Sequence, residues 1–183
     1  TDLEMGIRLE VRSVKVEEPG EALLPSARII AILREAMDEE LTIVAGPDGC
    51  QVLGNTNEFN MPGEDTATFP DFPEFVDEAC HEFTAGLLRE AIKRVAFEAV
   101  TEGQVRFGAM TGVLWELEPE RVILVATDGR RLAHMDVPAQ MQGTHAGGSE
   151  GQALVVPAKA MSLLERNLSE PSEKVRVHFR TNE

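Results

Sequence analysis

A short apolar run that stops in a polar turn and then resumes constrains this sequence more than any other feature. Val122 to Ala126 is rich in aliphatic and β-branched residues, which is typical of a buried strand. Thr127-Asp128-Gly129 follows and favours a tight turn, because Asp hydrogen-bonds to nearby backbone and Gly tolerates positive φ. We therefore expect a strand, a turn and a second strand.

The corner after this turn carries Arg130, Arg131 and Leu132. Two guanidinium groups beside an apolar side chain suit a docking site for a peptide with a carboxylate or carbonyl group and an apolar anchor. The alternative is an ordinary hairpin corner whose arginines face water, as surface arginines usually do. The residues alone leave both interpretations open.

Composition limits the possible classes of protein. The chain has 183 residues, 43% of them hydrophobic, so it can form one large domain or two small ones. No stretch approaches the roughly 18 to 20 apolar residues of a membrane span, and no secretory signal or initiator Met is present, so we expect a cytoplasmic fragment. Cys50 and Cys80 lie far apart and the histidines are scattered, so we expect no metal, disulfide or cofactor.

The first part of the chain shows strand, helix and strand patterns. Met5 to Val16 alternates apolar and polar residues, which predicts a half-buried strand. A helix is expected from Ser26, a plausible cap, with Ile29, Ile30, Leu33 and Met37 on one side. A hairpin (41–45 and 50–53) and a strand (58–61) follow, and then a Pro/Phe-rich segment to Phe75 that we interpret as an extended linker held by its aromatic rings.

The second part begins the same pattern again. We expect a strand at 80–83, Thr84 as a cap, and a helix to about Val100 whose apolar side includes Leu87, Leu88, Ala91, Ile92, Val95 and Ala99. Strands are expected at 112–117, 122–126, 132–137, 153–156 and 175–179, with a Gly-rich connection at 143–151 and a helix at 157–168.

An internal repeat becomes visible when the two parts are superimposed. Thr1-Asp2-Leu3 matches Thr127-Asp128-Gly129, and Leu24-Pro25-Ser26 matches Val156-Pro157-Ala158. The offsets are 126 and 132 residues, and the longer Gly-rich loop accounts for the difference.

These motifs together resemble the bacterial sliding clamp family, the β subunits of DNA polymerase III. The resemblance rests on Ala126 to Ala133, on Val155 to Lys159, on the Thr1-Asp2-Leu3-Glu4 start and on Phe69-Pro70-Asp71-Phe72-Pro73, in the family's order and spacing. It implies an α+β DNA-clamp fold, with antiparallel sheets, paired helices on the inner face and internal strand-helix-strand repeats. It also implies a non-catalytic processivity factor that forms a homodimeric ring around duplex DNA.

The resemblance assigns a domain to each part of the chain. Residues 1–63 correspond to the back half of a first clamp domain, 64–75 to an interdomain linker, and 76–183 to a second, central domain that is incomplete at its C-terminal end. The family's third domain is not represented.

The resemblance also explains how a chain of net charge −15 can meet DNA. A sliding ring needs only a few cations on its inner helices, which attract phosphates without reading bases. The candidates are Arg28, Arg34, Arg89, Lys93, Arg94, Lys159 and Arg166. The alternative is an ordinary solvated helix face, stabilised by pairs such as Glu90 with Arg94.

By the same resemblance, the corner forms one wall of a pocket for short linear peptides of the replicative polymerase, the clamp loader and repair polymerases. The matching positions are Met110, Thr127, Gly129, Arg130, Arg131 and Leu132. The sequence departs from the family in two ways. Arg130 stands where many members have His, and Arg106 to Gly112 is one residue longer than usual.

Two other classes of function stay open. A hydrolase-like enzyme would use Asp128 with His134 or Asp136 nearby, but no nucleophile elbow, metal spacing or phosphate loop accompanies them. The chain would otherwise be a general protein-interaction domain without a role on DNA. Only the clamp hypothesis predicts that charge reversal on the helices affects DNA binding.

Overall fold

The computed structural model describes residues 6–46, 49–71, 74–75, 79–99, 108–143 and 154–179. Its elements fall into two units, Thr1–Pro73 and Glu74–Glu183. The expectations for the first five residues, Phe72, Pro73, Arg106 and the loop after Gly143 concern parts of the chain outside the described ranges.

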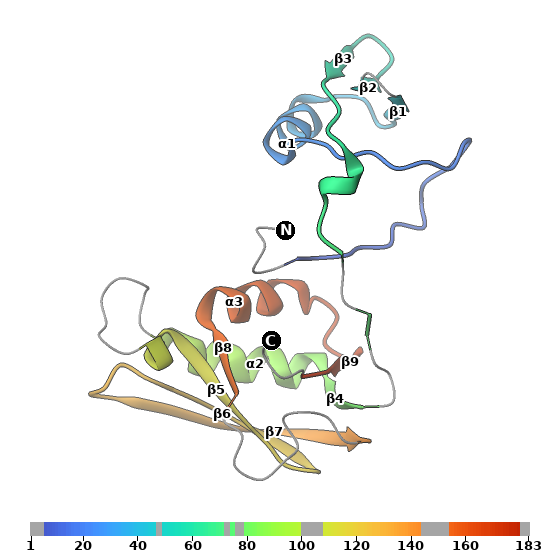
Figure 1. The fold of residues 1–183 in the computed structure, drawn as a ribbon. Helices are drawn as coiled ribbons and strands as arrows, with labels where there is room; N and C mark the ends of the chain where they lie inside the picture. The colour runs from blue at the N-terminus through green and yellow to red at the C-terminus, as the bar shows by residue number, and fades with distance from the viewer. Residues whose placement is uncertain are drawn as a thin grey trace. The chain divides into compact units, whose positions relative to one another are not determined.

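The second unit contains a six-stranded antiparallel sheet with the order β8-β5-β6-β7-β4-β9 (Figure 1). Its strands are β4 (Cys80–Thr84), β5 (Gly112–Leu117), β6 (Arg121–Thr127), β7 (Leu132–Gln142), β8 (Leu154–Pro157) and β9 (Lys174–Val177). β6 pairs on both sides, and its alternating residues Val122, Leu124 and Ala126 are buried. The predicted strand, turn and strand are confirmed.

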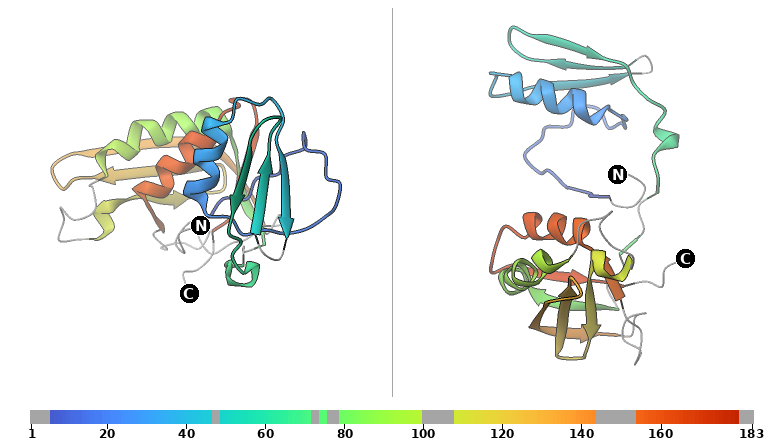
Figure 2. Two further views of the ribbon diagram at one scale, coloured as in Figure 1. Left: turned by 90° about the horizontal axis from the view of Figure 1, so that it is seen from above. Right: turned by 90° about the vertical axis from the view of Figure 1, so that its left-hand side faces the viewer.

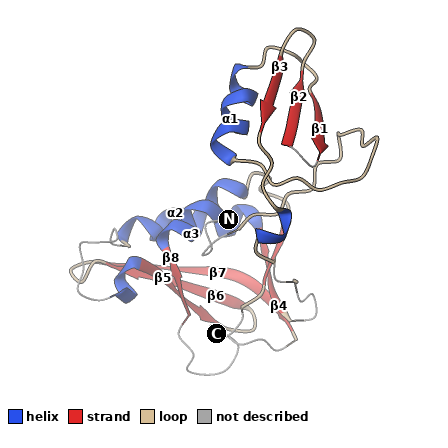
Figure 3. Cartoon of the chain, turned by 45° about the horizontal axis from the view of Figure 1, so that its top comes forward, coloured by secondary structure: helices blue, strands red, loops and turns tan. Residues whose placement is uncertain are grey.

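Two helices cover one face of this sheet, as Figure 3 shows: α2 (Ala85–Val95) and α3 (Ala158–Asn167). The buried side of α2 contains Leu88, Ala91, Ile92 and Val95, at the helical spacing expected for a core-facing stripe. The α-helix is shorter than expected, because after Val95 it tightens into the 3-10 turn η2 (Ala96–Glu98). Leu87 is exposed rather than part of the stripe.

Three aromatic rings pack together at the otherwise mainly aliphatic core of the second unit. The Trp115 ring meets Phe83 and Phe179 edge-on, at centroid distances of 6.1 and 5.4 Å. Such edge-to-face pairs contribute about 0.5–1.5 kcal/mol each beyond the burial of their area. The core therefore ties β4 and β5 to the C-terminal part of the described chain.

The first unit is smaller. Helix α1 (Ser26–Glu35) lies against a three-stranded antiparallel sheet of β1 (Thr42–Gly46), β2 (Gly49–Leu53) and β3 (Glu58–Met61), as Figure 2 shows. The predicted hairpin and the following strand are confirmed. The core consists of Cys50, Val52 and Met61, with partly buried apolar side chains of α1 and its surroundings packed on it.

Two expectations for the first unit were wrong. Residues 6–16 form no strand and are exposed, because among the described residues no strand pairs with them and alternation alone cannot bury a side chain. The predicted stripe of α1 was also misplaced. Ile29 and Ile32 face the sheet, whereas Ile30, Leu33 and Met37 are exposed.

The proposed helix caps were likewise only partly right. Pro25, not Ser26, occupies the N-cap position of α1, and its carbonyl accepts hydrogen bonds from the Arg28 and Ile29 N–H groups. Thr84 is the N-cap residue of α2 as expected, but its side chain makes no capping hydrogen bond.

The internal repeat is confirmed at the elements that the structure describes. α1 and α3 both have ten residues, and both begin directly after a proline at the N-cap position. Ser26 and Ala158 are 132 residues apart, and so are Thr42 and Lys174, where the following strands β1 and β9 begin.

The described residues of the Pro/Phe-rich segment make local contacts. The Asp65 side chain accepts a hydrogen bond from the Ala67 N–H and so caps the 3-10 turn η1 (Thr66–Thr68). At the start of the second unit, the Phe75 ring packs edge-on against His178 and lies under the Arg176 guanidinium, 5.7 Å from its carbon. The expectation of aromatic anchoring is confirmed for Phe75.

A network of hydrogen bonds fixes the turn between β6 and β7. The Asp128 carboxylate accepts the N–H groups of Arg130 and Arg131 at 2.8 and 2.7 Å, and these bonds, together with the Arg131 guanidinium, lower the pKa of Asp128. The Thr127 hydroxyl donates to the Arg131 carbonyl at 2.6 Å and accepts the Gly129 N–H. Gly129 has a φ of +82°, which glycine adopts without strain.

Asp128→Ala should lower the melting temperature of the chain more than Asp128→Asn, because the amide oxygen can still accept both backbone N–H groups. The ionised carboxylate stabilises the fold at neutral pH, since its pKa is lower folded than unfolded. Its advantage over the amide should therefore disappear as the pH falls through the folded pKa, below about 3.9. Thermal melts of the wild type, Asp128→Ala and Asp128→Asn between pH 7 and pH 2.5 measure this. A difference in melting temperature between the wild type and Asp128→Asn that grows on acidification would contradict it.

Amide hydrogen exchange should separate the two parts of the chain. Residues 122–126 pair on both sides within the sheet, whereas residues 7–11 belong to no strand, so their opening free energies should differ by about 3 kcal/mol or more. Exchange followed by mass spectrometry at low protein concentration tests this. Equal protection of both segments would show that 6–16 is ordered by contacts that this structure does not contain.

Candidate functional site

The seven predicted DNA-facing cations all lie on the three α-helices, and all are exposed. On α1, Arg34 lies on the side away from Ile29 and Ile32, which pack on the sheet, whereas Arg28 is one turn before Ile32 and flanks that side. Lys159 and Arg166, seven residues apart, belong to α3. On α2, the side that bears Arg89, Lys93 and Arg94 is opposite the buried stripe. At about 3.6 residues per turn, these three positions fall on the other side of the helix from the core residues.

Charge is distributed unevenly between these helices and the rest of the chain. α1, α2 and α3 together carry seven of the 17 Lys and Arg residues but only three of the 32 Asp and Glu residues. Each helix is therefore net positive within a chain of net charge −15. One cation is partly neutralised, since the Arg94 Nε lies 2.7 Å from the Glu90 carboxylate, and the expected i,i+4 pair is confirmed.

The structure also brings the predicted corner residues together. Thr127 and Leu132 are paired across the two strands, and the Leu132 side chain is 65% exposed. Met110, in the 3-10 turn η3 (Gly108–Thr111), reaches the same corner, because a Cβ placed on Gly129 would lie 3.5 Å from its terminal methyl carbon. The corner thus presents apolar surface beside two arginines.

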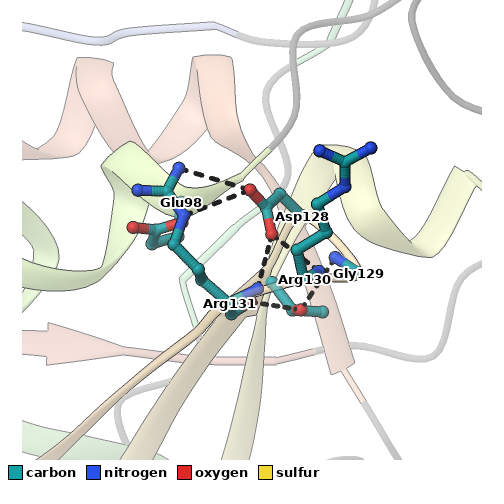
Figure 4. A network of polar contacts seen from close by, with 6 residues as sticks. Glu98, Asp128, Gly129, Arg130 and Arg131 are labelled. Atoms are coloured by element: carbon teal, nitrogen blue, oxygen red, sulfur yellow. Dashed lines mark hydrogen bonds and ion pairs between the residues drawn. The ribbon is translucent and has the colours of Figure 1, made fainter.

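The two arginines of the corner have different surroundings (Figure 4). The Arg131 guanidinium pairs with the Asp128 carboxylate at 3.3 Å, and its Nε lies 3.5 Å from the Glu98 Oε2. The Arg130 guanidinium extends away from both carboxylates in Figure 4. Arg131 is therefore held by two anions, whereas Arg130 is directed outward.

Glu98 is a residue of this site that our sequence reasoning missed. It is buried, with 7% of its surface exposed, and it follows α2 in the 3-10 turn η2. One signal was present in the sequence. Glu98 continues the core row of Leu88, Ala91 and Val95 at helical spacing, so an acidic residue stands where an apolar one is expected.

The residues considered for an enzyme do not meet in one cluster. The Asp128 carboxylate is occupied by the turn, and Asp136 pairs with Arg121 at 3.1 Å and with His134 at 3.3 Å. In the described ranges, no group of three or more His, Cys, Asp and Glu residues is placed to hold a metal ion, and no described helix is long and apolar enough to cross a membrane.

Comparisons with known proteins place this architecture in a family. Residues 82–183 match the family described as "DNA polymerase III beta subunit, central domain". The beta sliding clamp of Staphylococcus epidermidis is 25% identical over 171 residues, which are 93% of this chain and 43% of that protein.

Two solved structures show the same fold. The DNA polymerase sliding clamp of Bacillus subtilis superposes with a TM-score of 0.76 at 23% identity, over 91% of this chain and 42% of that one. The DNA polymerase III subunit beta of Pseudomonas aeruginosa bound to griselimycin gives 0.75 at 25% identity, over 89% and 42%. The chain thus spans less than half the length of the relatives it matches. On the family match, which covers more than half of its residues, this chain belongs to the DNA polymerase III β subunit family.

Proposed function

We propose that this chain forms part of a sliding clamp, a ring that encircles duplex DNA and tethers the replicative polymerase to it. The observation that carries the proposal is the concentration of cations on the exposed sides of α1, α2 and α3 in a chain that is otherwise strongly acidic. Membership of the β subunit family supports it. The proteins that share the family and the fold are named as sliding clamps of bacterial DNA polymerase III.

A sliding ring must attract DNA and still be able to move along it. A sliding ring requires contacts to phosphates, which carry no sequence information, and these contacts weaken steeply with salt. A few cations suffice, and acidic surface elsewhere repels DNA from the exterior. Lys93 and Arg89 should contribute more than Arg94, because Glu90 already pairs with Arg94.

The second functional surface in this proposal is the corner of β6 and β7. Leu132 and Met110 supply apolar wall, Thr127 and Gly129 form the rim, and the two arginines supply charge. We propose that this surface binds short linear peptides of the polymerase, the clamp loader and repair polymerases. Exposed apolar side chains beside rigid, hydrogen-bonded backbone are the usual anchor points of such peptides.

The proposal also assigns the parts of the chain. Residues 1–63 correspond to the back half of a first clamp domain, 64–75 to the linker and 76–183 to the central domain. To the complete clamp we assign a third domain, a homodimeric ring and a cytoplasmic location. In this assignment the protein has no catalytic role, and Asp128 serves to cap a turn.

Charge reversal on α2 should weaken the attraction of the complete clamp for DNA. For Arg89→Glu with Lys93→Glu, we expect the slope of log K against log salt to fall by about 0.9 for each phosphate that the protein no longer neutralises. Fluorescence anisotropy with labelled duplex at about 25–200 mM salt measures the slope. The control is Lys15→Glu, in a segment outside the helices, which should leave it unchanged. An equal response of both proteins would show a general charge effect and no helix interface.

Leu132→Asp should remove peptide binding at the corner. A carboxylate placed against an apolar anchor should raise the Kd of a labelled peptide with leucine and phenylalanine side chains roughly a hundredfold. The matched control is Leu87→Asp, which changes an exposed leucine away from the corner, on α2, and should bind the peptide like wild type. If Leu132→Asp keeps its affinity, the corner is an ordinary hairpin corner.

A further inference from the structure

The two arginines of the peptide corner cannot have the same role, because only one of them is tied to a buried anion. The Glu98 side chain is only 7% exposed, and among the described residues its ion pair is with the Arg131 Nε at 3.5 Å. The Glu98 Oε2 accepts no hydrogen bond from the described residues, so the ion pair with Arg131 is what offsets its charge there. A buried carboxylate without a partner is costly, so the fold resists any movement of Arg131 toward a ligand.

A second carboxylate acts in the same direction. The Asp128 Oδ2 lies 3.3 Å from Nη2 and 3.4 Å from Nε of Arg131. Asp128 in turn is fixed by two backbone N–H groups, so it cannot follow a guanidinium that swings outward. Arg131 is thus bracketed by an anion on the turn and an anion on η2, although 72% of its side-chain surface is exposed.

We propose that Glu98 is a positioning residue that withdraws Arg131 from the bound peptide and leaves Arg130 as the cation that reads an acidic residue beside the apolar anchors. This inference rests on the proposed peptide-binding role of the corner and adds its charge specificity. Arg130 is exposed, only its backbone N–H is engaged by Asp128, and its guanidinium points away from the network (Figure 4). The occupant it fits is a peptide with a carboxylate next to its leucine or phenylalanine.

The same contact joins the two functional surfaces. Glu98 ends the 3-10 turn η2 that follows α2, the helix of Arg89, Lys93 and Arg94, and Arg131 belongs to the corner. In the wild type two carboxylates hold Arg131, and Arg130 is the cation directed outward. In Glu98→Gln only the Asp128 carboxylate holds Arg131.

The experiment compares two labelled peptides that differ only in having Asp or Asn beside the leucine and phenylalanine anchors. Their Kd values are measured by anisotropy on the complete clamp, and the ratio of the two is the readout. Wild type should prefer the Asp peptide about two- to fivefold, the effect of one exposed ion pair. Arg130→Gln should abolish this preference, and Arg131→Gln should retain it.

Glu98→Gln, which is nearly isosteric, should increase the preference for the Asp peptide, because Arg131 is then held by Asp128 alone and more of its charge acts on the peptide. The increase should vanish in the double variant Glu98→Gln with Arg131→Gln and should weaken with salt. A purely structural role of Glu98 would change both Kd values equally and leave their ratio unaltered. If Glu98→Gln does not fold, as judged by circular dichroism, the contrast between Arg130→Gln and Arg131→Gln still decides which arginine reads the carboxylate.

Each outcome bears on one proposal or on both. Loss of the preference in Arg131→Gln, with retention in Arg130→Gln, would overturn this inference and leave peptide binding at the corner intact. An unchanged ratio in a folded Glu98→Gln protein would overturn it as well. Failure of both peptides to bind the wild-type clamp would overturn the proposed peptide site together with this inference.

Discussion

The capping of the β6–β7 turn by Asp128 is the interaction on which the rest of the second unit depends. One carboxylate satisfies two backbone N–H groups and fixes a register in which Thr127 faces Leu132. Because side chains alternate along a strand, a slip of one residue would turn Val122, Leu124 and Ala126 out of the core. The turn therefore specifies the sheet and at the same time presents Leu132 at the corner.

The turn also brings distant parts of the chain together. Met110 reaches Gly129 from η3, and Glu98 reaches Arg131 from η2, the turn that follows α2. The helix that carries cations and the corner that offers apolar surface thus meet at one ionic contact. The net negative charge of the chain does not oppose a role on DNA, because the acidic residues lie almost entirely outside the three helices.

Strong local signals made much of the fold predictable from the sequence. Neighbouring residues determine the strand at 122–126 and the turn after it. The repeat offset of 132 residues could be found because a proline precedes a helix at both places. The failures came where tertiary partners decide. Residues 6–16 alternate like a strand but pair with no strand among the described residues. On α1, Ile32 rather than Ile30 or Leu33 packs on the core of the first unit. For the site, the corner residues followed from the family resemblance. Glu98 escaped notice because its partner lies 33 positions away in sequence.

Topological retention on DNA tests the central claim most directly, since a ring that encircles DNA is held by the continuity of the DNA and not by affinity. The complete clamp is loaded on a nicked circular plasmid and washed at high salt, and the bound fraction is measured before and after the plasmid is cut once. The account predicts that the clamp stays on the circle and leaves when the DNA becomes linear. Release from intact circles at high salt, or retention that cutting does not change, would contradict it.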